Sequence, residues 1–321
     1  MKRVLVSEPI HPAGIERLAA EVEVVYLDGR PVEEVIAEVD GALVRTLKMP
    51  AVLLARATRL KVIAKHGVGV DNVDVAAATA RGIPVAYTPG ANDQSVAEHT
   101  LTMMLMLAKR MKPNESAVHG GRFNAARGDF RSVELRGKTL GLVGVGRIGS
   151  KLAGMCTAAF DMPVLAFDPY VSSDRAAALG VELVSLDRLL AESDFVSVHT
   201  PLTAETRGLI GARELARLKS TAFLVNCARG GIVDEAALVE ALDSGRLAGA
   251  GLDVFVSEPI DPASPLLRRD GVVRENVVVT PHVAGSTTDS LRVMALAAAD
   301  EILAVLRGDR ARNVVNPAVY A

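Results

Sequence analysis

The chain has 321 residues, of which 50% are hydrophobic and 23% are charged, a composition typical of globular proteins with ample material for a core. This length predicts about two domains of roughly 150 residues each. The 36 basic and 38 acidic side chains nearly cancel, so charge gives no case for binding nucleic acid or an anionic membrane surface.

Short apolar runs alternate with helical patterns along the first third of the chain. The runs are nearly continuous in Val, Ile, Leu and Ala, as is typical of parallel strands buried on both faces. They predict strands at 4–6, 22–26, 42–44, 61–64 and 85–87. Helices are expected between them, at 13–20, 32–39 and 75–81.

A helical pattern over 96–111 follows the first series and is rich in Met and Leu. We interpret Met103, Met104 and Met106 as packing residues of a core or interface. The next segment, 112–136, is only weakly periodic, and packing against another subunit would explain it.

A second series of strands and helices begins at Leu140. Strands are predicted at 140–143, 164–167, 195–198, 222–225, 249–254 and 277–280. Helices are predicted at 150–159, 173–179, 186–191, 211–218, 235–244 and 290–307. The last helix leads away from the second sheet, and we expect the tail at 313–319 to dock on the first domain. Two such series predict an α/β fold with two doubly wound parallel-sheet domains.

Cysteine content and hydropathy limit the classes of protein to which the chain can belong. Cys156 and Cys227 have no spacing typical of a metal site, so we expect two reduced thiols and no metal. The longest apolar stretch, 101–108, is far shorter than the roughly 20 residues needed to span a bilayer. No leader-like segment follows Met1. The expectation is a cytoplasmic protein with no membrane or nucleic-acid partner.

The run Val143-Gly-Val-Gly-Arg-Ile-Gly149 contains the pattern G-x-G-x-x-G between a predicted strand and a predicted helix. Its glycines permit a tight turn and close approach of the backbone to a pyrophosphate, which the helix N-terminus attracts. The predicted binding residues are Gly144, Gly146, Arg147, Ile148 and Gly149. Asp168, about 20 residues further on at the next strand end, is placed to bind the adenosine ribose and to repel a 2′-phosphate. The predicted cofactor is therefore NAD rather than NADP.

Three chemically different side chains follow three consecutive strands of the second series. Arg229 follows 222–225, Glu258 follows 249–254 and His282 follows 277–280. Ligands gather at the carboxyl ends of parallel strands. Reduction of a 2-oxo acid needs a cation for its carboxylate, a proton donor for its carbonyl oxygen and a partner for that donor. The three residues supply one candidate for each role.

The sequence resembles the D-isomer-specific 2-hydroxyacid dehydrogenase family over essentially its full length. The resemblance is carried by HGVGVDNVD at 66–74, PGANDQSVAEHTLTMML at 89–105, GKTLGLVGVGRIG at 137–149, NCARGGIVDEAAL at 226–238, GLDVFVSEP at 251–259 and VVTPHVAGST at 278–287. It implies that Arg229 orients the substrate, that His282 is the general acid/base and that Glu258 binds the histidine.

The resemblance also implies a discontinuous layout. A flavodoxin-like substrate-binding domain would comprise 1–96 and 286–321, and a Rossmann nucleotide-binding domain would comprise 97–285. A homodimer would form through about 97–136 of the nucleotide domain.

Further contacts are implied by the same resemblance. In the first domain the backbone of Val68 and Gly69 would cradle the substrate carboxylate, and Asn92 would face the substrate. Thr200 and Pro201, with Thr206 nearby, would form a wall on the adenine side.

The expected cofactor contacts include four more residues. Asp253 would lie near the nicotinamide carboxamide. Cys227, close to Arg229 in the sequence, is expected to line the cofactor pocket. Ala228 and Gly285 are also expected to contact the cofactor. For His66, contact with the substrate and a structural role are equally favoured alternatives. For His99, a structural role is favoured.

The implied reaction moves a hydride between NAD and C2 of a small 2-hydroxy or 2-oxo acid. Leading substrates are 3-phosphoglycerate and glyoxylate or hydroxypyruvate. Formate relatives carry Gln where this chain has Glu258, which argues against formate; a phosphite dehydrogenase and an NAD-sensing scaffold or corepressor on the same fold stay open.

Two further cations extend the substrate hypothesis. Arg45 and Lys65 end neighbouring strands of the first series and suggest a site for a second anionic group. Phosphoglycerate dehydrogenases place basic residues at similar positions, although Arg is common where this chain has Lys65, and solvated strand-end charges are the alternative.

Overall fold

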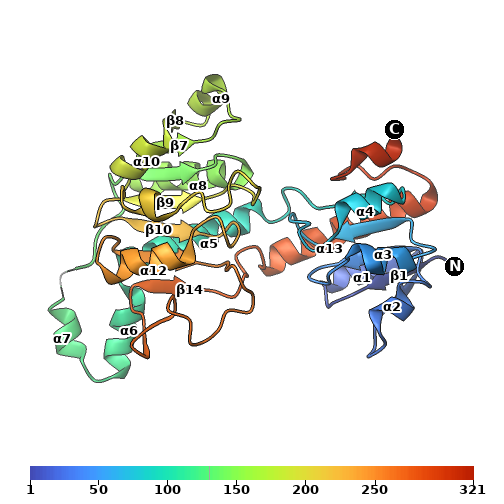
Figure 1. The fold of residues 1–321 in the computed structure, drawn as a ribbon, viewed down its shortest axis with the longest axis horizontal. Coiled ribbons are helices and arrows are strands. Elements are labelled where there is room, and N and C mark those ends of the chain that lie inside the picture. Colours follow the sequence, from blue (N-terminus) through green and yellow to red (C-terminus); the bar gives the residue numbers. More distant parts are fainter. Residues whose placement is uncertain (130) are drawn as a thin grey trace. The chain divides into compact units, whose positions relative to one another are not determined.

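The computed structural model describes residues 1–129 and 131–321. They form two compact units, each built around its own parallel sheet (Figure 1). The first unit comprises Met1–Asn92 and Ser286–Ala321, and the second comprises Asp93–Gly285. The family resemblance placed the first division after residue 96, whereas the units divide after Asn92, and helix α5 begins at Asp93.

The first unit holds a five-stranded sheet with the order β2-β1-β3-β4-β5, and all of its pairs are parallel. Its strands are β1 (Arg3–Val6), β2 (Glu23–Val25), β3 (Gly41–Val44), β4 (Val62–Lys65) and β5 (Val85–Ala86). Its helices are α1 (Pro12–Ala19), α2 (Val32–Val35), α3 (Ala51–Arg56), α4 (Val75–Ala80) and α13 (Thr288–Arg307).

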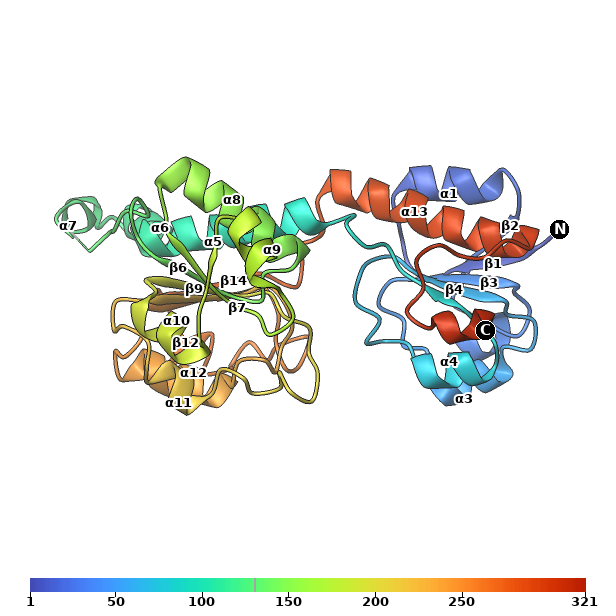
Figure 2. The same cartoon turned by 90° about the horizontal axis from the view of Figure 1, so that it is seen from above.

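Helices cover both faces of this sheet (Figure 2). α1 and α13 pack together on one face, where a Cβ added to Gly14 would lie 2.7 Å from the Cβ of Ala295. The other face is buried by α2, α3 and α4. The tail docks on the edge strand, because Val315 N–H donates to Val85 O (3.0 Å) and Val85 N–H donates to Asn316 Oδ1 (2.8 Å).

The second unit holds a seven-stranded parallel sheet with the order β14-β11-β10-β9-β6-β7-β8. Its strands are β6 (Leu140–Val143), β7 (Val164–Phe167), β8 (Glu182–Leu183), β9 (Phe195–Val198), β10 (Phe223–Asn226), β11 (Gly249–Leu252) and β14 (Val277–Val279). Its helices are α5 (Asp93–Ala108), α6 (Met111–His119), α7 (Phe123–Arg127), α8 (Arg147–Phe160), α9 (Ser173–Ala178), α10 (Leu186–Glu192), α11 (Ala212–Leu215) and α12 (Glu235–Asp243). A small hairpin, β12 (Arg268–Arg269) with β13 (Val272–Val273), precedes β14.

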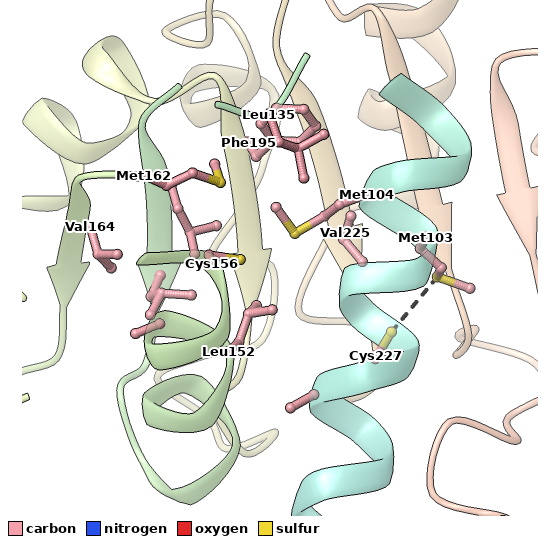
Figure 3. Close-up of a cluster of buried hydrophobic side chains, with 14 of the residues drawn as sticks. Met103, Met104, Leu135, Leu152, Cys156, Met162, Val164, Phe195, Val225 and Cys227 are labelled. Atoms are coloured by element: carbon pink, nitrogen blue, oxygen red, sulfur yellow. Dashed lines mark hydrogen bonds between the residues drawn. The ribbon is translucent and has the colours of Figure 1, made fainter. Parts of the chain in front are cut away.

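The core of the second unit lies on both sides of its sheet (Figure 2). On one side α5 packs against α8, and Met103 and Met104 lie in the same buried cluster as Leu152 and Cys156 (Figure 3). The methionine-rich helix is therefore a packing element, as its composition predicted. On the other side α10, α11 and α12 cover the strands.

The predicted α/β class with two parallel sheets is confirmed, but several element boundaries were wrong. The helix expected from Ser150 begins at Arg147, because Gly146 is already its N-cap. The helix expected over 96–111 ends at Ala108, and Arg110 adopts a left-handed φ of 51° before α6 starts. The segment 112–136 contains most of α6 and all of α7, although its periodicity predicted neither.

In the part of the chain that the structure describes, no helix is both long and apolar enough to cross a membrane. The same residues contain no group of three or more His, Cys, Asp or Glu side chains arranged to hold a metal ion.

Candidate functional site

The glycine motif forms a tight turn between β6 and α8. Gly144 has a φ of +94°, and a Cβ added there would lie 3.0 Å from the backbone of His199. A Cβ added to Gly149 would lie 2.6 Å from Gly144 O. These two positions therefore exclude side chains, so that the first turn of α8 can pack closely against β6 and β9.

The middle glycine faces open space instead. A Cβ added to Gly146 would meet no atom within 4 Å, and no side chain caps the helix that Gly146 begins. The first N–H groups of a helix have no partner within the helix, and they attract anions. An uncapped helix end beside a bare glycine fits the pyrophosphate of a dinucleotide, with Arg147 and Ile148 in the first turn.

Asp168 follows β7 and holds this turn in place. Its Oδ2 accepts from Val145 N–H at 3.0 Å, inside the glycine motif, and its Oδ1 accepts from Tyr170 N–H at 3.0 Å. A carboxylate oxygen can accept more than one hydrogen bond. The carboxylate can therefore fix the glycine turn and still accept from ribose hydroxyls.

The segment after β9 is held by its own threonines. Thr206 Oγ1 donates to Pro201 O at 2.6 Å and accepts from Thr203 N–H at 2.7 Å. Thr200, Pro201 and Thr206, predicted as an adenine-side wall, therefore belong to one internally bonded loop.

His199, which sequence reasoning did not single out, lies under the glycine turn. Burial lowers its pKa to about 4, and its Nε2 lies 2.9 Å from Ser197 Oγ. His199 is therefore a neutral structural residue at neutral pH. The pattern S-x-H at the end of a buried strand was the only sequence signal for it.

Arg229, Glu258 and His282 follow β10, β11 and β14, which are neighbours in the sheet. Asn226 shapes the turn before Arg229, because its Nδ2 donates to Arg229 O (2.9 Å) and its Oδ1 accepts from Ala228 N–H (3.0 Å). A Cβ added to Gly230 would lie 2.0 Å from Phe255 O, so this turn lies directly against the loop that carries Glu258. The strand order thus brings the arginine and carboxylate loops together.

Glu258 and His282 form a hydrogen-bonded pair. Nδ1 of His282 lies 2.8 Å from Oε2 of Glu258, and Oε1 of Glu258 accepts from Phe255 N–H at 3.0 Å. The side chain of His282 is 49% exposed, and that of Glu258 is 37% exposed. With Nδ1 engaged by a carboxylate, Nε2 is left to exchange a proton with a ligand.

Asp253 holds the backbone around His282. Its carboxylate, 1% exposed, accepts from Val283 N–H at 2.9 Å and Ala284 N–H at 2.8 Å and also from the Thr280 hydroxyl. His282 has a left-handed φ of 54°, and its N–H donates to Asp253 O at 2.8 Å. Asp253, predicted to lie near the nicotinamide, thus makes its contacts within the loop of the catalytic candidate.

His99 extends this network to helix α5. Its Nε2 lies 2.9 Å from Thr280 Oγ1. This contact agrees with the structural role that the sequence favoured for His99.

The Cys227 thiol points into the core rather than along the turn that carries Arg229. Its Sγ lies 3.8 Å from the sulfur of Met103 on α5 (Figure 3). Burial raises the pKa of Cys227 to about 12. A role of this residue in the cofactor pocket stays a prediction without support from the side-chain placement.

In the first unit the turn after β4 presents two backbone N–H groups. Thr88 braces the turn, because its Oγ1 bonds with both N–H and C=O of Gly67 at 3.1 Å. Among the described residues, the N–H groups of Val68 and Gly69 have no hydrogen-bond acceptor. They are therefore available to an anionic group, as the resemblance implies.

His66, which precedes this turn, and Asn92 contribute buried polar atoms to the first unit. Neither ring nitrogen of His66 nor Oδ1 of Asn92 has a partner in the described chain. Burial and the charge of Arg45 lower the pKa of His66 to about 4. His66 is therefore a neutral residue at neutral pH.

Lys65 and Arg45, the two cations predicted to bind an anion, differ in the contacts that their side chains make. The Lys65 amine donates to Arg45 O and, at 2.7 Å, to Asn72 Oδ1. The Arg45 guanidinium has no ion-pair or hydrogen-bond partner within residues 1–129 and 131–321. Arg45 is thus the better candidate for a direct anion contact.

Comparisons with known proteins identify the family. Residues 101–284 match the model described as "D-isomer specific 2-hydroxyacid dehydrogenase, NAD binding domain". The chain is 44% identical to the D-3-phosphoglycerate dehydrogenase of Archaeoglobus fulgidus over 98% of its own length. It spans only 59% of the length of that relative.

Solved structures agree with this match. A D-lactate dehydrogenase from Aquifex aeolicus complexed with NAD and lactic acid is 32% identical with a TM-score of 0.86, and the match covers 98% of this chain and 99% of that one. An NADPH-dependent glyoxylate/hydroxypyruvate reductase from Sinorhizobium meliloti in complex with NADP and malonate is 33% identical with a TM-score of 0.86, covering 98% and 96%. The chain belongs to the D-isomer specific 2-hydroxyacid dehydrogenase family.

Proposed function

We propose that the protein is an NAD-dependent D-2-hydroxyacid dehydrogenase, which moves a hydride reversibly between the cofactor and C2 of a small 2-hydroxy or 2-oxo acid. The observation that carries this proposal is the 2.8 Å contact between His282 and Glu258, in the loops that follow two neighbouring strands. Such a pair provides a positioned proton donor and acceptor. NADH absorbance during a screen of 2-oxo acids tests the activity.

Each side chain has a distinct role in the proposed mechanism. The bound cofactor would accept the hydride as NAD⁺ and supply it as NADH. Arg229 binds the substrate carboxylate and carbonyl oxygen through its guanidinium fork. In reduction His282 gives its Nε2 proton to the carbonyl oxygen; in oxidation it takes the hydroxyl proton. Glu258 keeps the ring oriented by binding Nδ1.

The proposed substrates are 3-phosphoglycerate and glyoxylate or hydroxypyruvate, with preference for an acid that carries a second anion. Arg45 supports this preference, because its planar guanidinium has no carboxylate partner among residues 1–129 and 131–321. Arg229 is already assigned to the first carboxylate.

Replacement of Arg45 by alanine tests the substrate preference. We expect Arg45→Ala to raise KM for phosphohydroxypyruvate, the 2-oxo acid that corresponds to 3-phosphoglycerate, about tenfold or more. This is the effect of losing one charge-assisted contact worth about 1.4 kcal/mol. KM for glyoxylate should change less than about twofold, since glyoxylate lacks a second anion. Arg56→Ala, at the exposed end of α3, is the control. Equal effects of Arg45→Ala on both substrates would exclude a second-anion site.

Asp168 supports NAD over NADP, because its carboxylate at the end of β7 repels a 2′-phosphate. We expect kcat/KM for NAD to exceed that for NADP by at least about tenfold, or 1.4 kcal/mol. Asp168→Ala should narrow the ratio, whereas Asp174→Ala on the exposed start of α9 should preserve it. Equal efficiency of the wild-type protein with both cofactors would contradict the assignment.

We propose a homodimer formed through 97–136. Within this segment Met111, Val118 and Phe123 expose more than half of their surface on α6 and α7, and an unpaired apolar surface of this kind favours association. Phe130, also in the segment, lies outside the described residues. Sedimentation equilibrium measures the mass, and a monomer at micromolar concentration would exclude this assembly.

A cytoplasmic location is also proposed. Both cysteines are free and buried, and burial raises the pKa of Cys156 to about 12. Unpaired thiols are common in reducing compartments. Cell fractionation with an antibody tests the location.

A further inference from the structure

The loop after β3 wraps its N–H groups around one carboxylate. Glu8 accepts from the N–H of Arg45 (3.0 Å), Thr46 (2.6 Å) and Leu47 (2.6 Å), and also from Thr46 Oγ1 (2.7 Å). The hydroxyl of Ser7 donates to the same carboxylate. Successive N–H groups that converge in this way form an anion-binding nest, and the anion in this nest is a side chain of the protein.

The carbonyl groups of the same loop are held by Lys65 and Asn72. The Lys65 amine donates to Arg45 O and to Asn72 Oδ1 (2.7 Å), and Asn72 Nδ2 donates to Leu47 O at 2.6 Å. The backbone N–H of Arg45 is therefore bonded to an anion, and its backbone C=O is bonded to a cation. Glu8 follows β1 and Lys65 ends β4, so the two charges come from the strands on either side of β3.

The protonation state of Glu8 fits this role. Burial would raise its pKa, but hydrogen bonds from the Ser7 and Thr46 hydroxyls and the Arg45 and Thr46 amides outweigh burial. The net pKa lies below the ordinary 4.5, so the carboxyl is ionised at neutral pH. Hydrogen bonds to an ionised acceptor are shorter and stronger than neutral ones.

This arrangement leaves one route by which the loop can bind a substrate anion. Its N–H groups already bind Glu8, so the nest is closed to a substrate phosphate or carboxylate. At position 45, the group that can still contact such an anion is the Arg45 guanidinium. A long arginine side chain binds an anion better when its backbone is held in one place, since less freedom is lost on binding.

We propose that Glu8 and Lys65 are positioning residues that clamp the loop 45–47 from opposite sides, so that the Arg45 guanidinium is presented to a second anionic group of the substrate. Lys65 acts through this clamp and not by touching the substrate. The inference rests on the proposed function, because it deepens the role given there to Arg45.

The test compares Glu8→Gln and Lys65→Met with two control variants of the same kind in the same unit. Glu16→Gln lies on the exposed face of α1, and Lys61→Met lies immediately before β4, at the end opposite to Lys65. We expect each clamp variant to raise KM for phosphohydroxypyruvate about tenfold, the effect of losing one charge-assisted contact. Turnover, KM for glyoxylate and both controls should change less than about twofold.

A double-mutant cycle separates the clamp from direct contact. In an Arg45→Ala background, Glu8→Gln and Lys65→Met should have no further effect on KM, because the group that they position is gone. If Lys65→Met raises KM again in that background, Lys65 binds the substrate itself and the clamp is wrong. Equal loss for glyoxylate and phosphohydroxypyruvate would also overturn it.

Two further measurements test the clamp if Glu8→Gln fails to fold or if the protein shows no turnover. Thr46→Ala removes one hydroxyl donor to Glu8 and should give a smaller rise of about threefold in KM even if Glu8→Gln fails to fold. If the wild-type protein reduces no 2-oxo acid, the proposed function fails, and calorimetric binding of the dianion malonate tests the clamp without turnover. Weaker malonate binding by the clamp variants supports the clamp; equal binding overturns it.

Discussion

We expect His282→Asn to lower kcat by about 100- to 10,000-fold, the usual contribution of a positioned acid or base. Asparagine can fill part of the space next to Glu258 but cannot exchange a proton at the substrate oxygen. Binding of NADH should persist, because the glycine turn is held by the bond from Val145 N–H to Asp168, which does not involve His282. Steady-state turnover and NADH fluorescence titration measure the two effects separately.

The control for this experiment is Asp174→Asn, since Asp174 lies at the exposed start of α9, outside the segment proposed for the dimer contact. It should leave kcat within about twofold of the wild type, as surface substitutions usually do. A His282→Asn protein that binds NADH and keeps near-normal turnover would remove His282 from the mechanism. A variant that no longer binds NADH would instead indicate a damaged fold.

Apolar runs predicted the two sheets well, because a buried parallel strand must be continuously apolar. β6, β7 and β9 begin and end at the predicted residues. Helix ends were less predictable: α8 begins three residues earlier than expected, because its first turn is formed by the glycine motif itself. The short helix α3 and strand β8 were missed, and both have too few residues for a clear period.

The candidate site was predictable where one residue follows one strand. Arg229, Glu258 and His282 each follow a long apolar run, and the strand order then makes their loops neighbours. The clamp of Glu8 and Lys65 was not predictable, because its contacts join residues that are 20 to 39 positions apart. Sequence separation hides such pairs, and the strand-end position of Lys65, together with the family resemblance, suggested a ligand contact instead.

The other large effect is expected at Asp253. Asp253→Ala leaves the N–H groups of Val283 and Ala284 without their acceptor, and a buried unsatisfied donor costs about 1–3 kcal/mol. We therefore expect the free energy of unfolding to fall by about 3 kcal/mol. The left-handed backbone of His282 also loses its support, so kcat should fall about 100-fold, since small displacements of a catalytic group have effects of this size.

Asp253→Asn distinguishes this role from the cofactor contact expected from the sequence. Asparagine retains one oxygen acceptor, so we expect a smaller loss of stability and of kcat, with the Kd of NADH within about threefold of the wild type. The control for a lost charge is Asp187→Ala, because the carboxylate of Asp187 pairs with Arg217 on the surface. If Asp253→Asn instead weakens NADH binding strongly and leaves kcat at saturating NADH unchanged, the carboxylate serves the nicotinamide directly. Loss of kcat with intact NADH binding means that Asp253 acts through the loop of His282.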